Sequence, residues 1–369
     1  MLDDQLAAYD EMRARCPVAH SDYLGWSLFR HDDVSRVLAD HETFSNAVAA
    51  RLTVPNGMDP PEHTEYRRIN DRYFTPELMD WFEPTCREVA VRLVEALPRD
   101  GVTEFAAELA EIYALRVQSA FLGWPAELEE PLRRWTRRNH EATLTRDGEA
   151  ISRVAIEFDG YIRELLAVRR EAGPAAPHDL TTRLLDERVW DRLMTDEELV
   201  SLLRNWTVGE LSTIAASVGI LAHFLARRPD VQQRLRDTPS LIPAANDEIL
   251  RIHAPLIANR RITTHPVEVG GRRLAGGDRV TVIWASANRD EAVFGDPDEF
   301  RLDRDPTTNL LYGAGIHVCP GAPLARLELR VLVEELLART AQVALAAGAV
   351  PVRATYPAGG FASLPLTIT

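Results

Sequence analysis

One apolar segment, residues 199–229, restricts the fold of this 369-residue chain more than any other feature. It stays apolar on most faces for about eight turns until it reaches Pro229. Thr195 and Glu198, just before it, form the capping box that marks the start of a helix. A helix this long and this apolar all round belongs in the middle of a large protein, where other elements cover it.

Other segments predict further helices and only a little sheet. Helical periodicity continues through 77–97, 104–123 and 175–187, and it resumes after Cys319. Short strand-like stretches lie at 25–30, 266–271, 279–285 and 362–369. We therefore expect a mainly α-helical protein with small peripheral β-sheets, and with more helix than the roughly 30–35% of typical globular domains.

Composition and punctuation favour one compact unit. With 46% hydrophobic and 27% charged residues, the chain has enough apolar side chains for a large core. The nearest candidate for a linker, residues 171–180, is a short Pro/Ala stretch that is more typical of a surface loop. We therefore interpret residues 1–369 as a single domain.

Several classes of protein are disfavoured. The amino terminus has neither a basic start nor an apolar core, so we expect no secretory signal, and we expect no membrane span. Three widely spaced cysteines fit a reducing compartment, which indicates a cytoplasmic protein. A net charge of -14 argues against nucleic acid as the main partner.

Cys319 lies between glycine-rich turns and the start of a predicted helix. At that position the helix dipole and the free N–H groups of Gly321 and Ala322 favour a thiolate. Gly313 and Gly315, like Gly321, allow the backbone to turn sharply and to approach a flat ligand closely.

Several roles are open to this cysteine. A buried, inert thiol is the simplest reading, and a catalytic thiol would use His317 as its base. A zinc site lacks further ligands at short spacing, and a c-type haem would need a second cysteine and an adjacent histidine. A single thiolate as the proximal ligand of haem iron fits all the local features.

The stretch from Tyr312 to Gly321 resembles the cysteine-loop signature of the cytochrome P450 monooxygenases, and so implies their fold. The matching residues are Tyr312, where the family usually has Phe, and Gly313, Gly315, His317, Cys319 and Gly321. Leu324, Ala325 and Arg326 continue the family pattern into the next helix. The resemblance implies that Cys319 binds the iron and that the loop and Ala325 contact the cofactor.

Further matches follow in family order. Glu248 and Arg251 resemble the Glu-x-x-Arg pair, whose spacing puts both side chains on one helix face. Residues 287–304 resemble the stretch that leads into the family's meander. Glu299 stands where an arginine often completes the cluster, so we expect Arg301 or Arg304 to take that role.

Haem propionates are anions and need cationic partners. The resemblance assigns this role to His63 and Arg67, which lie four residues apart, and to Arg261 and His317. Each of these residues taken alone is more often a surface cation. Together, in family order, they favour propionate binding.

The long apolar helix should cross the opposite, distal face, where the family carries an acid directly followed by an alcohol for proton delivery. Aligning on Gly209 puts Ser212 in the alcohol's place, whereas counting back from Pro229 puts Thr213 there. We expect a π-bulge to absorb the difference, with Thr213 as the alcohol and Glu210 as the acid. The alternative is that Thr213 only bonds back within the helix and Glu210 faces solvent.

The resemblance also predicts the wall of the substrate pocket. Small apolar residues dominate it, with Arg51 and Asn259 as polar anchors. This favours a small, mainly apolar organic substrate. The contributing stretches are residues 45–57, residues 135–145, Leu211, residues 256–260 and the turn at Phe361.

Taken together, the resemblance implies a haem-thiolate monooxygenase of the bacterial type that carries haem b (iron protoporphyrin IX). It would insert one atom of O2 into its substrate by hydroxylation or oxidative dealkylation. Electrons would come from a separate ferredoxin and an NAD(P)H-dependent ferredoxin reductase, docked on a basic face. That face would comprise Arg67, Arg68, Arg72, Arg326 and Arg330.

Two alternatives stay open. One is a peroxide-driven peroxygenase or decarboxylase on the same fold, which the unusual distal motif favours. The other is a non-catalytic haem protein that binds small molecules as a sensor or carrier.

Overall fold

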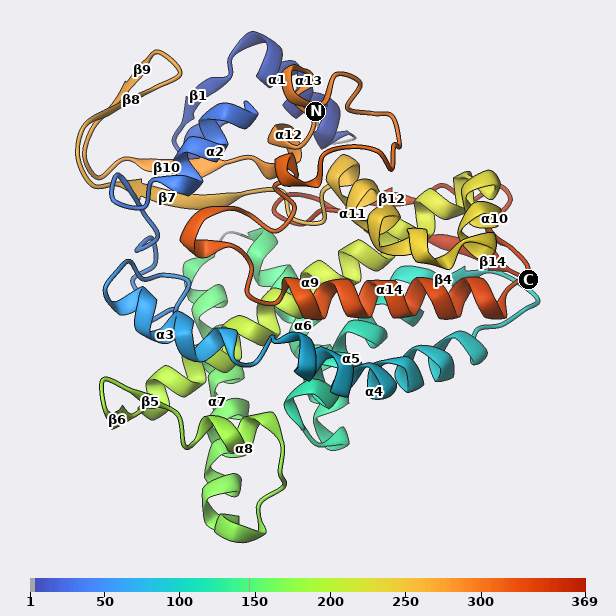
Figure 1. Cartoon of the computed structure of the whole chain (residues 1–369), viewed down its shortest axis with the longest axis horizontal. Coiled ribbons are helices and arrows are strands. Elements are labelled where there is room, and N and C mark those ends of the chain that lie inside the picture. The colour runs from blue at the N-terminus through green and yellow to red at the C-terminus, as the bar shows by residue number, and fades with distance from the viewer. Residues whose placement is uncertain (1–3, 146) are drawn as a thin grey trace.

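The computed structural model describes residues 4–145 and 147–369, so Met1 to Asp3 of the amino-terminal segment lie outside the described residues. Helices dominate it, with small sheets toward the periphery (Figure 1), which confirms the predicted fold class. The α-helices are α1 (Gln5–Arg15), α2 (His31–Ala39), α3 (Glu62–Asp71), α4 (Pro76–Glu95), α5 (Glu111–Leu122), α6 (Glu129–Thr145), α7 (Gly148–Ala172), α8 (Leu180–Leu184), α9 (Asp196–Arg227), α10 (Pro229–Asp237), α11 (Ile242–His253), α12 (Trp284–Ala287), α13 (Glu291–Phe294) and α14 (Ala322–Arg339).

The strands form one five-stranded sheet and several smaller ones. The large sheet has the order β1-β2-β10-β7-β3, and a three-stranded sheet has the order β11-β14-β4. The strands are β1 (Val18–Ser21), β2 (Gly25–Leu28), β3 (Phe44–Ser45), β4 (Thr103–Glu104), β5 (Arg188–Val189), β6 (Arg192–Leu193), β7 (Asn259–Thr263), β8 (Val267–Val269), β9 (Arg272–Leu274), β10 (Arg279–Val282), β11 (Val343–Leu345), β12 (Val352–Arg353), β13 (Phe361–Ser363) and β14 (Pro365–Ile368).

Helix α9 is the central element, as the sequence predicts. Thr195 and Glu198 form the expected capping box, and Pro229 begins the next helix. By length and composition α9 could cross a membrane. It instead packs against α5, α7, α11 and α14, and many of its side chains are buried, so it is a core helix.

The expected π-bulge in α9 is wrong. The helix is α-helical from Asp196 to Arg227, because its ladder of i→i−4 bonds is not interrupted. The hydroxyls of Ser212 and Thr213 also donate hydrogen bonds to carbonyls four residues earlier, those of Val208 and Gly209. A π-helix does occur, but before α5, at Ala106–Ala110.

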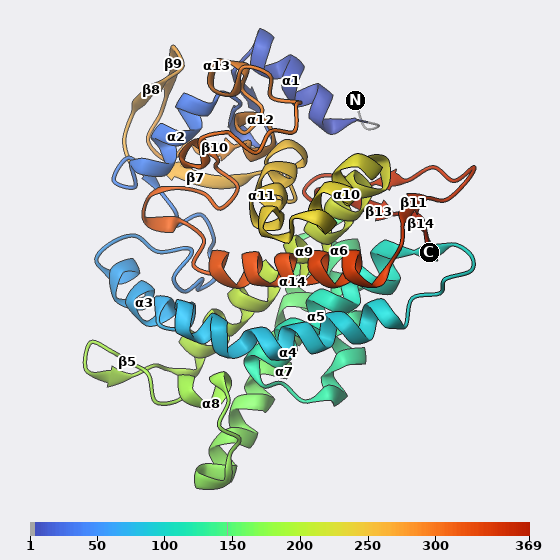
Figure 2. The ribbon, with the colours of Figure 1, turned by 45° about the vertical axis from the view of Figure 1, so that its right-hand side comes forward.

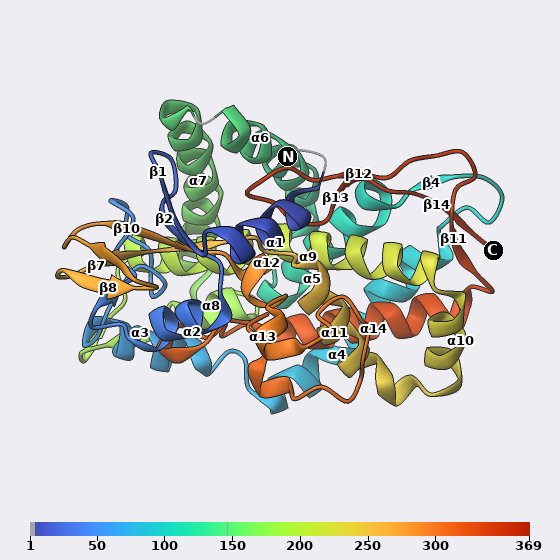
Figure 3. The ribbon, with the colours of Figure 1, turned by 90° about the horizontal axis from the view of Figure 1, so that it is seen from above.

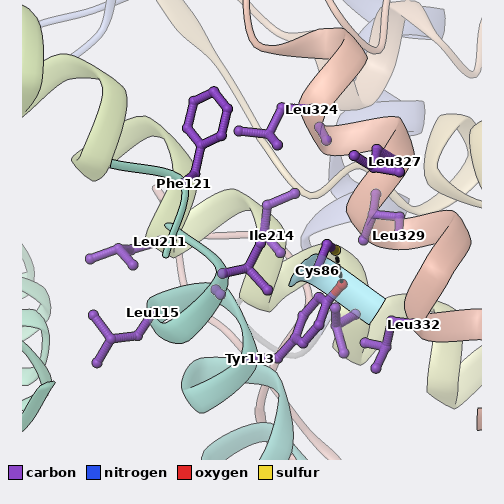
Figure 4. Packing of buried hydrophobic residues seen from close by; sticks show 14 of the residues in the cluster. Cys86, Tyr113, Leu115, Phe121, Leu211, Ile214, Leu324, Leu327, Leu329 and Leu332 are labelled. Atoms are coloured by element: carbon purple, nitrogen blue, oxygen red, sulfur yellow. Dashed lines mark hydrogen bonds between the residues drawn. The ribbon is translucent and has the colours of Figure 1, made fainter. Parts of the chain in front are cut away.

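Helix α14 packs along α4, and the two lie side by side in Figure 1 and Figure 2. Between α4, α5, α9 and α14 lies the main hydrophobic core, part of which Figure 4 shows. Helices α6 and α7 stand out together on one side of the molecule (Figure 3).

A buried ion-pair network holds the long loop that follows α13. Arg251 of α11 binds both carboxylate oxygens of Glu248 at 2.7 and 2.9 Å, and its guanidinium also donates to the carbonyls of Asn288 and Pro297 at 2.6 and 2.9 Å. Arg304 donates to Glu248 at 2.8 Å. The sequence predicts that either Arg301 or Arg304 completes the cluster, and it is Arg304 that does so.

Arg251→Ala should destabilise the fold strongly. Arg251 is 1% exposed, and its loss leaves Glu248 buried with one cation fewer and two loop carbonyls without a donor. We expect a loss of about 3–5 kcal/mol in the free energy of unfolding, measured by denaturant titration. The control is Arg301→Ala, because Arg301 pairs only with the exposed Asp296 and Asp303. Equal losses in both variants would contradict this account.

Candidate functional site

The loop before α14 is shaped by its glycines. Gly313 and Gly315 have φ of 76° and 68°, values that a residue with a side chain rarely adopts. A Cβ on Gly315 would also lie 2.2 Å from the carbonyl oxygen of Leu38. The loop closes through the N–H of Cys319, which donates to the carbonyl of Tyr312 at 2.8 Å. This conformation presents the thiol just before the helix.

Cys319 faces the start of α14, as the sequence predicts. Gly321 is the N-cap of the helix, and the backbone N–H groups of Gly321 and Ala322 lie close enough to the sulfur to favour its ionised form. Burial raises the pKa of the thiol above its ordinary value, and these two N–H groups partly offset that rise. A bound metal cation would supply the remaining stabilisation of a thiolate.

The thiol opens onto a large internal cavity of about 540 Å³. Residues of α3, α5, α9, β7 and α12 line it together with the cysteine loop and the start of α14. The cavity therefore lies between α9 and the cysteine loop, where the sequence places the cofactor. The predicted contact residues Tyr312, Gly313, His317, Gly321 and Ala325 all line it.

The four predicted propionate partners meet at one side of this cavity. The rings of His63 and His317 lie 4.3 Å apart. Arg67 donates to the carbonyls of Ile316 and Val318 at 3.1 and 2.7 Å, which ties α3 to the cysteine loop. Arg261 is 3% exposed and lines the same cavity.

The electrostatics of this cluster call for an anion. Burial, with help from His63, Arg261 and Arg67, lowers the pKa of His317 to about 3. Burial lowers the pKa of Arg261 to about 10, and only Asp59 acts against this. Burial and Arg67 lower the pKa of His63 as well. A dianionic ligand would reverse each of these unfavourable interactions.

Unpaired polar atoms gather around the same cavity. Several of the buried side-chain atoms that lack a hydrogen-bond partner belong to its lining. Buried polar groups are normally paired, so this concentration indicates a ligand that supplies the missing partners. The atoms are Asn46 Oδ1, His63 Nε2, Gln118 Oε1, Glu210 Oε1, Trp284 Nε1, Tyr312 OH and His317 Nε2.

On α9, both candidate alcohols line the cavity. The Thr213 hydroxyl donates to the carbonyl of Gly209 at 2.6 Å, and that of Ser212 to Val208 at 3.2 Å. Both hydroxyls therefore donate to carbonyls of the same helix. For Thr213, this is the bonding that the alternative interpretation of the sequence expects. Leu211, in the acid's place when aligned on Gly209, is buried.

Glu210 does not face solvent. Its carboxyl group lies beside that of Glu328 on α14. No N–H or O–H of another described residue reaches either oxygen of Glu328, so the two carboxyls can bond to one another only when one of them carries a proton. Burial raises the pKa of both groups, and Glu210 adds to the rise at Glu328.

The acid pair has polar neighbours but no ion-pair partner among the described residues. Tyr113 of α5 donates to the backbone carbonyl of Glu328 at 2.8 Å, and the Tyr113 hydroxyl lies 3.3 Å from the sulfur of Cys86 on α4. Figure 4 shows Cys86 and Tyr113 pointing toward one another inside the apolar core. Neither group offers a charge that would ionise the pair.

The predicted pocket wall is confirmed in part. Residues of the 45–57 stretch and of the segment before Arg261, including Asn259, line the cavity. Residues 135–145, Leu211 and Phe361 do not. Arg51 is not an anchor either, because it forms an ion pair with Asp159 of α7.

The arginines predicted to form a basic docking face are all paired with acids. Every arginine proposed for it has a carboxylate partner, so the face carries acids as well as bases. The pairs are Arg67–Asp71 (2.5 Å), Arg68–Glu65 (3.4 Å), Arg72–Glu187 (3.2 Å), Arg326–Asp247 (3.0 Å) and Arg330–Glu83 (2.5 Å).

Sequence reasoning missed Glu328 and Trp284. Glu328 follows Leu324 by four residues, so helical spacing could have placed it on the face of α14 that meets the cavity. Trp284 carries no comparable signal, because it comes directly after a buried strand and reads as core.

Comparisons with known proteins agree with this geometry. The family profile described as Cytochrome P450 matches residues 240–341. Nocardicin C N-oxygenase of Nocardia uniformis subsp. tsuyamanensis is 37% identical, over 85% of this chain and 81% of that protein. Cytochrome P450 130 of Mycobacterium tuberculosis is 32% identical, over 98% of this chain and 92% of that protein.

Solved structures agree as well. A structure of a mutant of P450 EryK in complex with erythromycin B has a TM-score of 0.89 and 29% identity, covering 98% of this chain and 95% of that one. CYP109E1 from Bacillus megaterium in complex with testosterone has a TM-score of 0.86 and 26% identity, covering 98% and 99%.

The family implies a haem-thiolate cofactor, and the residues around the cavity fit one. A thiol beside two backbone N–H groups opens into the cavity, and cationic and other polar side chains without partners gather around it. A flat ligand with an iron centre and two carboxylates satisfies both features. The chain therefore belongs to the cytochrome P450 family and is a monooxygenase, an oxidoreductase with haem-thiolate chemistry.

Proposed function

We propose that residues 1–369 form one haem domain that binds haem b, with Cys319 as its iron ligand. The alternative of covalent attachment has no support, because the other cysteines, Cys16 and Cys86, are not among the residues that line the cavity. When bound, such a cofactor activates O2 with two electrons and two protons and inserts one oxygen atom into an organic substrate. The buried polar atoms without partners around the cavity carry this proposal.

His63, Arg67, Arg261 and His317 would hold the two propionates. The histidines have low pKa values in the protein alone, but each neutral ring still offers one N–H donor. Arg261 keeps its charge at neutral pH, because its pKa remains about 10. This set of donors explains why the cysteine loop and α3 are joined by Arg67.

On the distal side, Thr213 would act as the alcohol. Its 2.6 Å bond to the carbonyl of Gly209 fixes the hydroxyl proton, which leaves the oxygen lone pairs free as acceptors at the cavity. Ser212 is held less closely, at 3.2 Å. Glu210, three residues before Thr213, would supply protons from the pair that it forms with Glu328.

The substrate would be a small, mainly apolar organic molecule. Apolar lining residues such as Val48, Val208 and Leu256 support this, and the amides of Asn46 and Asn259 offer a few polar contacts. The named relatives include an N-oxygenase, an epoxidase and a hydroxylase/epoxidase. Hydroxylation or oxidative dealkylation is the reaction we propose here.

A cytoplasmic ferredoxin and an NAD(P)H-dependent ferredoxin reductase would supply electrons. Among the described residues no group of three or more His, Cys, Asp or Glu side chains could hold a metal cluster, so a separate electron donor fits. Because the arginines on the expected face are paired, we expect docking to depend only weakly on salt.

One observation favours a second candidate. The residue directly before Thr213 is not an acid, and Glu210 is engaged with Glu328. A peroxide-driven peroxygenase needs no proton relay from solvent for O2 reduction. The test compares the rate of product formation with peroxide alone and the rate with ferredoxin, its reductase and NAD(P)H. A peroxide-driven rate at least as high as the other would support this candidate over the monooxygenase.

Cys319→Ala should abolish thiolate ligation. Reduced wild-type protein under carbon monoxide should show a strongly red-shifted Soret band, because the thiolate pushes charge onto the iron. The variant should lose this band. Cys16→Ala is the control, since Cys16 is not among the lining residues. A variant at 319 that keeps the band would refute the ligand assignment.

Glu328→Gln should flatten the pH dependence of stability. The folded protein keeps a proton that the unfolded chain releases above the ordinary glutamate pKa of 4.5. Wild-type stability should therefore fall as pH rises from 4.5 through the raised folded values, by up to about 1.4 kcal/mol per pH unit for each proton.

The variant removes one of the two titrating carboxyls and adds an amide donor for Glu210. Denaturant unfolding of the holoprotein between pH 5 and pH 8 measures the slope of stability against pH. The control is Glu88→Gln, a helix carboxylate with 59% of its side chain exposed, which should keep the wild-type slope. An unchanged slope in Glu328→Gln would mean that the acid pair does not share a proton.

Thr213→Ala should uncouple the enzyme. Without the Thr213 hydroxyl the distal side of the cavity would lose a group that can pass or hold a proton, so more electrons should appear as hydrogen peroxide and less product should form per NAD(P)H. Ser212→Ala should have a much smaller effect, because one residue turns the side chain by about 100° on a helix. The reverse result would make Ser212 the alcohol.

A further inference from the structure

Trp284 differs from the other tryptophans of this protein. Of the seven in the chain, Trp81 and Trp190 are 62% and 49% exposed and reach solvent. Four more donate their indole N–H to an oxygen of another residue: Trp26 to Asp278 (3.0 Å), Trp124 to Thr181 (3.0 Å), Trp135 to Val154 (2.8 Å) and Trp206 to Asn70 (2.6 Å). Trp284, 7% exposed, has a buried Nε1 with no partner among the described residues.

The strand before Trp284 directs its side chain to the cofactor side of the sheet. In β10, Val280 and Val282 lie opposite Arg261 and Asn259 of β7. Residues directly opposite in an antiparallel pair share one face, and side chains two apart along a strand share it as well. Ile283 continues the extended backbone, so Trp284 falls in line with Val282 and on the face that Arg261 uses.

The indole also contacts the cysteine loop. A Cβ on Gly313 would lie 3.6 Å from Cη2 of Trp284, so the six-membered ring of the indole lies against the start of the loop. Trp284, Gly313 and His317 line the same cavity. An indole N–H can only donate, and a buried donor left without an acceptor is unfavourable.

No acceptor among the described residues reaches the indole N–H of Trp284. Asn46 Oδ1 also lines this cavity without a partner, but it does not lie within hydrogen-bond distance of Trp284 Nε1. Asp59, which acts on Arg261, is already bonded to Ser45 and to the backbone N–H of Asn46. The acceptor for Trp284 must therefore come from a ligand that carries carboxylate oxygens.

We propose that the indole N–H of Trp284 donates a hydrogen bond to a haem propionate, as a fifth propionate partner beside His63, Arg67, Arg261 and His317. The inference rests on the proposed placement of the propionates. Trp284 would differ from the other four partners because its indole N–H is neutral and does not titrate. Its hydrogen bond would therefore not depend on pH.

Trp284→Phe tests this, because phenylalanine keeps an aromatic ring and removes the N–H. The holoprotein, without substrate, is mixed with excess apomyoglobin, and the rate of haem transfer is followed in the Soret band. We expect haem to leave about tenfold faster from the variant, because a hydrogen bond to a charged group is lost. Trp135→Phe is the matched control: Trp135 does not line the cavity, so the wild-type rate is expected.

The same measurement with the dimethyl ester of haem separates hydrogen bonding from packing. Esterification removes the propionate charge, so the ratio of the two rates should fall to within about twofold. A ratio that stays near tenfold would mean that Trp284 acts through packing alone, and would overturn the proposal.

Spectroscopy gives an independent readout on the holoprotein. The ultraviolet resonance Raman difference between wild type and Trp284→Phe isolates the indole of Trp284, and its N–H-sensitive band should have the position of a hydrogen-bonded indole. A free-indole position would refute the proposal. A second variant, Arg261→Ala, separates this proposal from the placement of the propionates on which it rests. If haem leaves faster from Arg261→Ala but at the wild-type rate from Trp284→Phe, only the role of Trp284 is rejected. If both variants lose haem at the wild-type rate, the placement of the propionates is rejected.

Discussion

The buried guanidinium of Arg261 is the interaction on which the rest of the site depends. It is 3% exposed, and within the described chain its side chain donates only to the carbonyl of Arg260, at 2.7 Å. A buried cation without a counter-ion is costly. The fold nevertheless brings His63, Arg67 and His317 to the same place. Such a cluster is stable only around an anion, so folding and cofactor binding are linked through it.

This cluster keeps its shape because ion pairs and hydrogen bonds outside the cavity fix the loops around it. Arg251 and Arg304 bind Glu248, and they also donate to the carbonyls of Pro297 and Asp296 in the loop that follows α13. The side chain of Asn288 accepts a hydrogen bond from the N–H of Leu310 at 2.8 Å, just before the cysteine loop. The ion pairs far from the cavity therefore determine where Cys319 and His317 lie.

The features that sequence could predict are those fixed by near neighbours. The capping box at Thr195, the glycine turns around Cys319 and the start of α14 follow from spacing and backbone chemistry, and the structure has them. Pairings between distant elements could not be predicted. Glu210 meets Glu328 and Arg72 meets Glu187 only through tertiary packing, and 118 and 115 residues separate the partners in the sequence. For the same reason the prediction placed residues 135–145 in the pocket wall, whereas Trp135 packs on Phe158 of α7.

The acid pair and the thiol constrain one another. Glu210 raises the pKa of Cys319, and the first cause of that rise is burial. An ionised Glu210 would therefore oppose the thiolate that the iron needs, whereas a protonated one removes this repulsion. Burial raises the pKa of both carboxyls, and the interaction between them raises that of Glu328 while it lowers that of Glu210, so Glu328 holds the shared proton more firmly. That proton reduces the negative charge of the pair and with it the repulsion on a thiolate at Cys319. A chain with two ionised carboxylates here would weaken its own metal ligand.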